Sequence, residues 1–354
     1  MKIVCVCRGY PTHRPGGMLY VCQDRARALV RAGHEVHVLT TGKTGQSIFD
    51  DKGVCVHYLD CESLIYTLRF AQQCSAWVDK FKPDILHLDG FDVNHPWWVD
   101  KKNSRCQVAI TMHGFGMGAF LTRWNLFLAE KIEDVSFQPS KLAKEAKIIS
   151  QANYIFAISL HEKWMLEDTY GLYGKVRLLY NPIAPYFYDK IEDQVDRSSF
   201  LCLGCKGTNG NRFFSFAVEA SKKASVGLMI VTDQPREQMP KMYHQSAGLV
   251  LPTYWSQGFD LTIAEALACR RRVIVTATGS YIREAENNPY LHLAPRGDID
   301  AIAEQMQKIF LLGPVDAEHP CRLQHRPDIY VQKWLEVFCK LPTTTVKKRY
   351  GLGL

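Results

Sequence analysis

Residues 251–285, LPTYWSQGFDLTIAEALACRRRVIVTATGSYIREA, contain the pattern that decides the fold of this chain. They read as the end of an apolar strand, a glycine-bearing loop, a helix up to residue 268 and a buried strand over residues 273–276. A strand that runs into a helix through such a turn presents unpaired backbone N–H groups at the positive end of the helix dipole. The stretch therefore predicts an anion-binding junction, and Glu265 lies too far along the helix to serve only as a cap.

Similar patterns of strand and helix alternate through nearly the whole chain, which is typical of parallel sheets joined by helical crossovers. In the first half we expect a helix over residues 18–32, closed by a left-handed Gly33, and strands over residues 3–7, 35–40, 84–88, 108–112, 154–158 and 176–180. In the second half we expect helices over residues 298–312 and 328–340, and strands over residues 200–203, 226–232, 248–251 and 273–276. The predicted fold class is α/β, with two doubly wound halves.

A stretch rich in proline and charge interrupts this alternation and predicts the boundary between two domains. We expect a Rossmann-like N-terminal domain and a Rossmann-like C-terminal domain, joined by a linker and followed by a helix and a basic tail. The expected bounds, in that order, are residues 1–185, 200–326, 186–199, 327–340 and 341–354.

The composition is that of a soluble globular protein with room for two cores, since the 354 residues are 47% apolar and 22% charged. No run reaches the roughly 18 to 20 apolar residues of a membrane span, and the N-terminus lacks the features of a signal peptide. We therefore expect a cytoplasmic protein. The twelve cysteines lie mostly in apolar runs, and Cys202 and Cys205 have no second pair at zinc spacing, so free thiols are expected.

Two glycines, Gly16 and Gly17, end the first loop and lead into the expected helix over residues 18–32. Paired glycines allow a backbone to approach a phosphate or a sugar closely, although a plain loop before a helix cap is the alternative. The loop is not GxGxxG, and no acidic residue follows the second strand at the ribose-binding spacing, which disfavours a nicotinamide enzyme. His113 ends the expected strand over residues 108–112 beside Gly114, and we expect it to project into a cleft.

These segments resemble those of the family 4 glycosyltransferases. Residues 29–40, LVRAGHEVHVLT, resemble the L...GHEV.VLT that follows the P..GG loop of that family, and residues 251–285 resemble its PS..EGFGL...EA.A.G.PV..T..GG..E. The resemblance covers about residues 1–310 in the right order. It implies the GT-B-type fold, in which two Rossmann-like domains face each other across a cleft and the final helix crosses back to the first domain.

The resemblance also implies the roles of individual residues. As catalytic residues, His113 would lie beside the donor sugar, Glu265 would hold the ribose hydroxyls of the nucleotide, and Gln257 would address the hydroxyls of the transferred sugar. Gln257 stands where the family usually has glutamate, so it keeps an acceptor oxygen but loses the charge. The donor-binding residues that the resemblance implies are Gly16, Gly17, Lys206, Arg212, Gly258, Phe259, Asp260, Leu261 and Glu265.

The chain departs from the family pattern near the expected diphosphate. Cys205 stands at the position of an arginine that neutralises this group in the family, so we expect Lys206 and Arg212 to supply the charge. Asp260 replaces a common glycine, and we expect its carboxylate either to turn outward or to cap the helix. Glu284 matches a family glutamate and is expected to anchor its loop.

The activity that the resemblance implies is retaining transfer of a sugar from a nucleotide-sugar donor to a hydroxyl of a glycan, a lipid-linked glycan or another cell-envelope acceptor. Asp89 and Asp92 hint at the acidic metal motif of other sugar transferases, but family 4 enzymes generally need no metal, so neither a metal nor another cofactor is expected. Two alternatives stay open. A sugar transferase acting on a hydroxylated base in DNA is suggested by the net charge of +7 and the arginine run 270–272. A catalytically weakened sugar-nucleotide binding protein is suggested by Gln257, Cys205 and Asp260.

Basic residues of the first half are expected to face the acceptor, namely Arg123, Lys141, Lys144 and Lys147. The three lysines share one side of a helix, and Ile148 and Ile149 are among the apolar residues alongside. Such a basic amphipathic pattern favours an anionic surface, either the inner face of a membrane or a nucleic acid, and the alternative is a solvated helix face.

Overall fold

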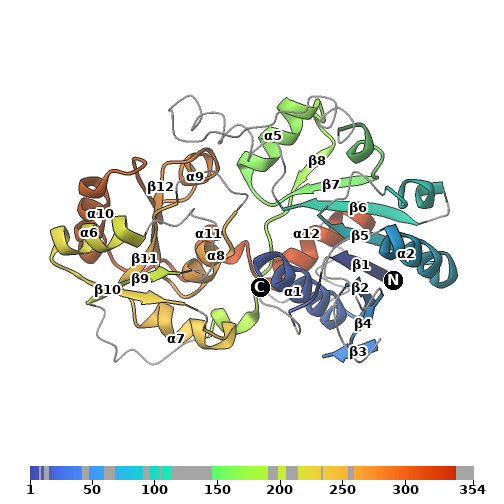
Figure 1. Ribbon diagram of the computed structural model, residues 1–354, viewed down its shortest axis with the longest axis horizontal. Helices are drawn as coiled ribbons and strands as arrows, with labels where there is room; N and C mark the ends of the chain where they lie inside the picture. The colour runs from blue at the N-terminus through green and yellow to red at the C-terminus, as the bar shows by residue number, and fades with distance from the viewer. Residues whose placement is uncertain are drawn as a thin grey trace.

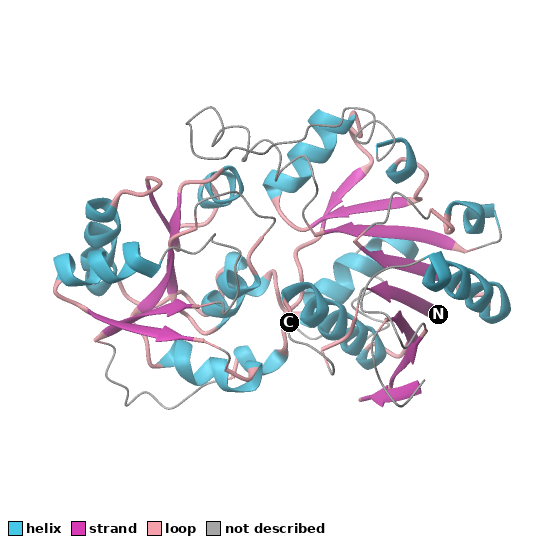
Figure 2. Ribbon diagram, in the orientation of Figure 1, coloured by secondary structure: helices cyan, strands magenta, loops and turns pink. Residues whose placement is uncertain are grey.

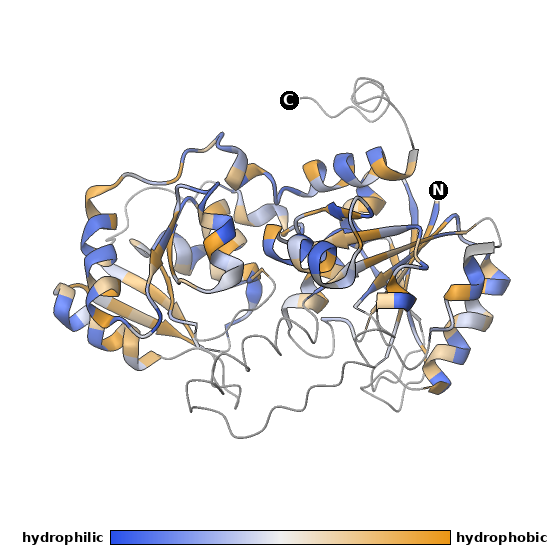
Figure 3. Cartoon of the chain, turned by 90° about the horizontal axis from the view of Figure 1, so that it is seen from above, coloured by the Kyte–Doolittle hydropathy of each residue, from blue (hydrophilic) through white to orange (hydrophobic). Residues whose placement is uncertain are grey.

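The computed structural model describes residues 1–7, 9–11, 16–41, 48–59, 68–90, 96–103, 106–113, 146–189, 198–204, 214–232, 234–253 and 259–339. Within them the chain forms two α/β domains that lie side by side, each built on its own sheet (Figure 1, Figure 2). Apolar residues concentrate in the strands, while the helices alternate apolar and polar faces (Figure 3). No helix in these ranges combines the length and the apolar character that crossing a membrane requires.

The N-terminal sheet has eight strands, which run parallel to their neighbours except for the antiparallel pair β3 and β4. Its central strands are apolar on both faces because helices cover both sides of a parallel sheet. In spatial order the strands are β3 (Ile48–Asp51), β4 (Val54–Tyr58), β2 (Glu35–Thr40), β1 (Lys2–Cys7), β5 (Ile85–Asp89), β6 (Gln107–Met112), β7 (Tyr154–Ala157) and β8 (Val176–Leu178).

Helices from both ends of the chain cover the N-terminal sheet. One face packs against α1 (Gly17–Arg31) and α12 (Pro327–Cys339), and the fully buried Trp334 of α12 lies in this core. The other face packs against α2 (Leu68–Phe81). The last long helix of the described chain is therefore part of the first domain in space, as Figure 1 shows. The domain also contains α5 (Leu160–Tyr170) and the short 3-10 helix η1 (Val99–Asn103).

The C-terminal sheet is entirely parallel and has helices on both faces. Its strands, in spatial order, are β10 (Gly227–Val231), β9 (Ser199–Leu203), β11 (Gly248–Leu251), β12 (Arg272–Thr276) and β13 (Leu291–Ala294). Its helices are α6 (Phe214–Ala224), η3 (Arg236–Gln238), α7 (Met239–His244), α8 (Leu261–Ala268), α9 (Gly279–Ala285), α10 (Ile299–Leu311) and α11 (Pro320–Leu323).

Two segments connect the domains, and the fully buried His325 links them to each other. The N–H of Ile183 donates to the carbonyl oxygen of His325 at 3.0 Å, and Nδ1 of His325 donates to the carbonyl oxygen of Asn181 at 2.9 Å. Phe187, in the short helix η2 (Pro185–Phe187), already packs in the C-terminal core. The second core therefore recruits residues from before β9, and residues 190–197 of the expected linker lie outside the described residues.

The predicted strands and helices are present in the described residues, with ends shifted by one or two positions. The hairpin of β3 and β4 is not among the predictions. Its two-residue turn, Lys52 and Gly53, has positive φ at both positions, 56° and 88°, which is the geometry of a type I′ turn. Type I′ turns usually contain Asn-Gly or Asp-Gly. Because lysine occupies the first position of this turn, the sequence did not predict the hairpin.

Candidate donor-binding site between the domains

The helix α8 begins at Leu261, and Asp260 is its N-cap. Oδ1 of Asp260 accepts hydrogen bonds from the N–H and the hydroxyl of Thr262, at 3.2 and 2.8 Å. Of the two orientations that the sequence allowed, the carboxylate thus takes the capping one, and its charge complements the helix dipole. Beside it, the buried Phe259 stacks on His325, with ring centroids 5.3 Å apart, and Leu261 opens the helix.

Glu265 lies inside α8, and the residue is 4% exposed. Both of its oxygens are engaged, since Oε1 accepts from Nε of Arg236 at 2.8 Å and Oε2 accepts from the Tyr243 hydroxyl at 3.1 Å. Burial raises the pKa of Glu265, and the Arg236 guanidinium opposes that rise. Each carboxylate oxygen has a second acceptor direction. The residue can therefore receive hydroxyl donors in addition to these two partners.

Arg236, on η3, reaches from Glu265 to the other domain. Its Nη1 donates to Oδ2 of Asp24 on α1 at 2.8 Å, and its guanidinium lies over the ring of Tyr20, 4.6 Å from the centroid. Arg236 and Asp24 are both buried. The third nitrogen, Nη2, is also buried and has no hydrogen-bond partner among the described residues. An arginine thus joins the domains and keeps one donor free beside Glu265.

His113 directly follows β6 in the N-terminal domain, and its ring is turned onto Asp89 of β5. Nε2 of His113 and Oδ1 of Asp89 are 2.8 Å apart, while Oδ2 of Asp89 accepts from the buried Arg25 of α1. Burial and the nearby Arg25 lower the pKa of His113 to about 3, so the neutral ring donates its Nε2 proton to Asp89. Asp89 therefore acts here as the partner of an arginine and a histidine.

The helix α1 contacts both halves of this region. Its N-cap is Gly16, and a Cβ added to the first helical residue, Gly17, would meet no atom within 4 Å. Further along, Asp24 bonds to Arg236 of the C-terminal domain, and Arg25 bonds to the Asp89 that holds His113. Asp24 and Arg25, which are consecutive on α1, thus connect the side chains around Glu265 with those around His113. The sequence predicted that both belong to one site.

Glu284, on α9, makes a second buried connection between the domains. Its Oε1 accepts from the backbone N–H of Leu160, at the start of α5, at 2.6 Å, and its Oε2 accepts from the Tyr180 hydroxyl at 2.9 Å. A buried carboxylate that holds a backbone N–H and a tyrosine hydroxyl of the other domain anchors its helix. The anchoring expected for Glu284 is therefore what the structure contains, although it joins domains rather than a loop alone.

Several predicted site residues lie outside the described residues, so their roles stay predictions. They are Gln257, Gly258, Lys206, Arg212, Arg123, Lys141, Lys144 and Asp92. Lys147 is described and exposed, but the neighbouring Ile148 and Ile149 are buried in the core of the N-terminal domain. The expectation that these two apolar residues face an anionic surface is wrong, because they pack under the sheet instead.

The sequence analysis missed Arg236, Asp24, Arg25 and Tyr243. Arg236 and Tyr243 follow the expected strand over residues 226–232, and no local pattern marks them as site residues. Asp24 and Arg236 are 212 positions apart, so no local pattern pairs them.

Two doubly wound domains that meet along such an interface define the GT-B class of glycosyltransferase folds. The chain is similar to sucrose-phosphate synthase from Thermosynechococcus elongatus, with a TM-score of 0.68 and 17% identity over 99% of both chains. It is also similar to the Anabaena protein HepE in complex with UDP and glucose, with a TM-score of 0.62 and 10% identity over 99% of this chain and 98% of that one.

Matches of the sequence to known families identify the family of this chain. Residues 15–186 match the model of Glycosyltransferase Family 4, and residues 185–311 match that of the Glycosyl transferases group 1. An uncharacterised glycosyltransferase of Methanocaldococcus jannaschii is 36% identical over 95 residues, which are 27% of this chain and 24% of that protein. The chain thus spans about a quarter of the length of this curated relative. It belongs to the family 4 type of glycosyltransferases.

Proposed function

We propose that this protein is a retaining glycosyltransferase that takes a sugar from a nucleotide-sugar donor and transfers it to a hydroxyl group. The observation that carries the proposal is the buried Glu265 carboxylate, held by Arg236 and Tyr243 on the first helix after the glycine-bearing loop, where the two domains meet. The Anabaena protein of the same fold was solved with UDP and glucose, which supports a nucleotide-sugar donor here.

In this proposal Glu265 accepts hydrogen bonds from the two ribose hydroxyls through its remaining acceptor directions. The leaving diphosphate needs positive charge or N–H donors that are in place before the bond breaks. Arg236 contributes Nη2, which has no partner among the described residues, and Lys206 and Arg212 contribute from the segment of sequence before α6. Gln257 holds the hydroxyls of the transferred sugar, and His113, fixed by Asp89, flanks it.

The acceptor hydroxyl then attacks the anomeric carbon from the face that the diphosphate leaves. The new glycosidic bond forms as the bond to the diphosphate breaks, and the acceptor proton passes to the leaving phosphate. The reaction therefore needs no side-chain base and, in this proposal, no metal ion. Asp89 is already paired with Arg25 and His113, which supports a role other than holding a cation.

For the acceptor we propose a glycan or a lipid-linked glycan of the cell envelope. The alternative of a nucleic-acid acceptor drew on the arginine run 270–272, whose three side chains donate to backbone carbonyl oxygens of Val315, Tyr243 and Gly313. These hydrogen bonds give the three arginines a structural role in the C-terminal domain, which weakens the argument for nucleic acid from this run. Binding to duplex DNA that weakens steeply with added salt would nevertheless revive that alternative.

The proposal is tested by thermal-shift screening against UDP-, GDP-, ADP- and CMP-sugars. A donor present at a hundredfold its Kd adds about 2.7 kcal/mol to the free energy of unfolding, so the right nucleotide stands out. Release of the nucleoside diphosphate then separates an enzyme from a sugar-nucleotide binding protein, which would bind the donor without turnover. NMR of the product's anomeric proton reports the configuration, and an inverted product would refute the retaining mechanism.

A further inference from the structure

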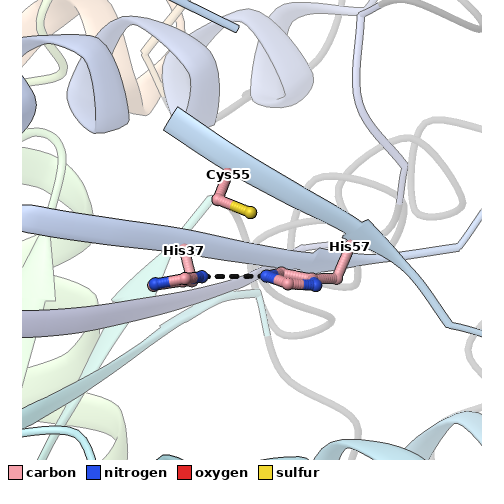
Figure 4. A group of neighbouring side chains, drawn as sticks. All are labelled: His37, Cys55 and His57. Carbon is pink, nitrogen blue, oxygen red and sulfur yellow. Dashed lines mark hydrogen bonds between the residues drawn. The ribbon is translucent and has the colours of Figure 1, made fainter. Parts of the chain in front are cut away.

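Three side chains with metal-binding atoms meet on β2 and β4, next to the edge strand β3 of the N-terminal sheet and away from the site described above. His37 of β2 pairs with Cys55 of β4 in the parallel register, and His57 follows two positions after Cys55, so all three side chains point to the same face. Their ligand atoms lie within 4.8 Å of one another. Figure 4 shows the two imidazole rings turned toward each other with the Cys55 sulfur beside them.

The ligand nitrogens of the two rings face each other across one hydrogen bond, so a cation that binds both takes the place of the bridging proton, and His57 then carries its proton on Nδ1. Nδ1 of His37 and Nε2 of His57 are 2.8 Å apart, and on the far side of the ring Nε2 of His37 lies 3.2 Å from Oε1 of Glu35. A carboxylate that holds the outer N–H of a histidine fixes the tautomer and leaves the inner nitrogen free to bind a metal. Carboxylate-supported histidines of this kind are common in zinc sites.

We propose that His37, Cys55 and His57 bind one zinc ion, through Nδ1, Sγ and Nε2 respectively. Two imidazoles and one thiolate are a soft ligand set that suits zinc better than magnesium or calcium. With bonds of about 2.0 Å to nitrogen and about 2.3 Å to sulfur, tetrahedral ligands lie about 3.3 to 3.7 Å apart. The rings would separate slightly and the sulfur would move inward by about 1 Å, which a rotation of the Cys55 side chain supplies.

The surroundings of the cluster also fit a bound ion. Trp77 and Phe81 of α2 cover the rings, with centroid distances of 5.3 and 4.4 Å from His37. The three ligand residues are only partly buried, so solvent reaches the fourth position. Binding replaces the Cys55 thiol proton, which passes to solvent, with a sulfur–zinc bond. The ion would tie β4 to β2 near the open edge of the sheet.

The cluster is distinct from the proposed donor site because it lies on the opposite face of the sheet. In the register of β2 with β1, His37 is opposite Val4, which belongs to the core under α2. Arg25, which bonds to Asp89 and so supports His113, comes from α1 on the other face. The zinc proposal therefore stands whether or not the proposed sugar transfer is correct.

The test measures zinc and cobalt binding by the purified full-length protein. After EDTA treatment and removal of EDTA, the wild type should bind one equivalent of zinc in competition with a chromophoric chelator. Cobalt in its place should give a thiolate charge-transfer band and the intense visible bands of a four-coordinate ion. Cys55→Ala and His57→Gln should lose the high-affinity equivalent, and Cys55→Ala should also lose the charge-transfer band. The control Cys321→Ala, which removes a thiol from the C-terminal domain, should behave as the wild type does.

Glu35→Gln provides a milder variant, since Glu35 is about half exposed and its replacement leaves the three ligands in place. Loss of such a supporting carboxylate weakens metal affinity by roughly 10- to 100-fold. Circular dichroism in EDTA checks that each variant is folded. The proposal is overturned if the wild type binds no equivalent, if Cys55→Ala keeps the cobalt band, or if Glu35→Gln binds zinc with unchanged affinity.

Discussion

Arg236 of the C-terminal domain donates a hydrogen bond to Asp24 of the N-terminal domain at 2.8 Å, inside the protein and away from solvent. The same guanidinium donates to Glu265, also at 2.8 Å. The residue proposed to hold the ribose is therefore part of the buried contact that sets how the two domains meet. Substitutions here change both donor binding and stability, and the experiments below separate the two effects.

Asp24→Ala should lower the free energy of unfolding by about 3 to 5 kcal/mol, because it leaves one side of the buried Arg236 charge without a partner. The measurement is urea unfolding followed by circular dichroism. The matched control is Asp79→Ala, which removes the partner of Lys101 in an ion pair of 2.6 Å whose aspartate is 60% exposed. That change should cost less than about 1 kcal/mol. Equal, small effects of both substitutions would contradict the interdomain role of Asp24.

Glu284→Ala should destabilise the protein by about 2 to 4 kcal/mol, since it leaves the Leu160 N–H and the Tyr180 hydroxyl unpaired in the interior. Tyr180→Phe removes one of these two hydrogen bonds together with its donor and should cost about 1 kcal/mol. Thermal and urea unfolding of both variants show which substitution lowers the free energy of unfolding more. If Tyr180→Phe were the more damaging change, Glu284 would not be the anchor of this contact.

Stability should fall as the pH drops from about 6.5 toward 4, in part because of His325. Burial lowers the pKa of His325 to about 4, so the unfolded chain binds a proton in this window and the folded chain does not. The stability that the neutral, buried His325 contributes is fully present above pH 6.5 and is lost as the pH falls toward 4. A pKa shift of this size corresponds to about 3 kcal/mol of unfolding free energy. His325→Gln should reduce the slope of the unfolding free energy against pH by about 1 kcal/mol per pH unit. An unchanged slope would show that His325 is protonated in the folded protein.

Sugar transfer should survive EDTA, because the proposed mechanism places the diphosphate against arginine and lysine side chains. The measurement is the initial rate of nucleoside diphosphate release with and without the chelator, at a temperature well below unfolding. Removal of zinc from the cluster of His37, Cys55 and His57 should lower the melting temperature without lowering this rate. A complete loss of rate that added metal restores would mean that a cation takes part in the reaction.

The sequence predicted the architecture because the apolar periodicity of strands and helices is a local property and is clear in both halves of the chain. It also placed Glu265 correctly on the helix after the glycine-bearing loop, since the cap at Asp260 and the apolar run behind it define that helix. It left the packing between the domains open. Arg236 reads as an ordinary surface residue until the fold brings Asp24 to it.

Two residues or residue pairs show what periodicity alone leaves open. His113 follows a strand and precedes Gly114, a pattern from which we expected a ring that projects into the cleft. The contacts that hold this ring, to Asp89 on the adjacent strand and through it to Arg25 of α1, come from residues distant in sequence. Ile148 and Ile149 give the same amphipathic pattern whether the apolar face meets a membrane or a sheet. Only the packing decides between these, and here it is the sheet.

The central claim, that Glu265 holds the nucleotide of the donor, is tested most directly by titration calorimetry of UDP, or of the nucleotide that the thermal screen selects. Glu265→Gln keeps an acceptor for its neighbours but loses the charge, and a charged hydrogen bond contributes about 1.5 to 3 kcal/mol. We therefore predict that its affinity falls roughly 10- to 100-fold, while Glu284→Gln, a buried control in the same domain, binds as the wild type does. A folded Glu265→Gln protein with wild-type nucleotide affinity would contradict the account.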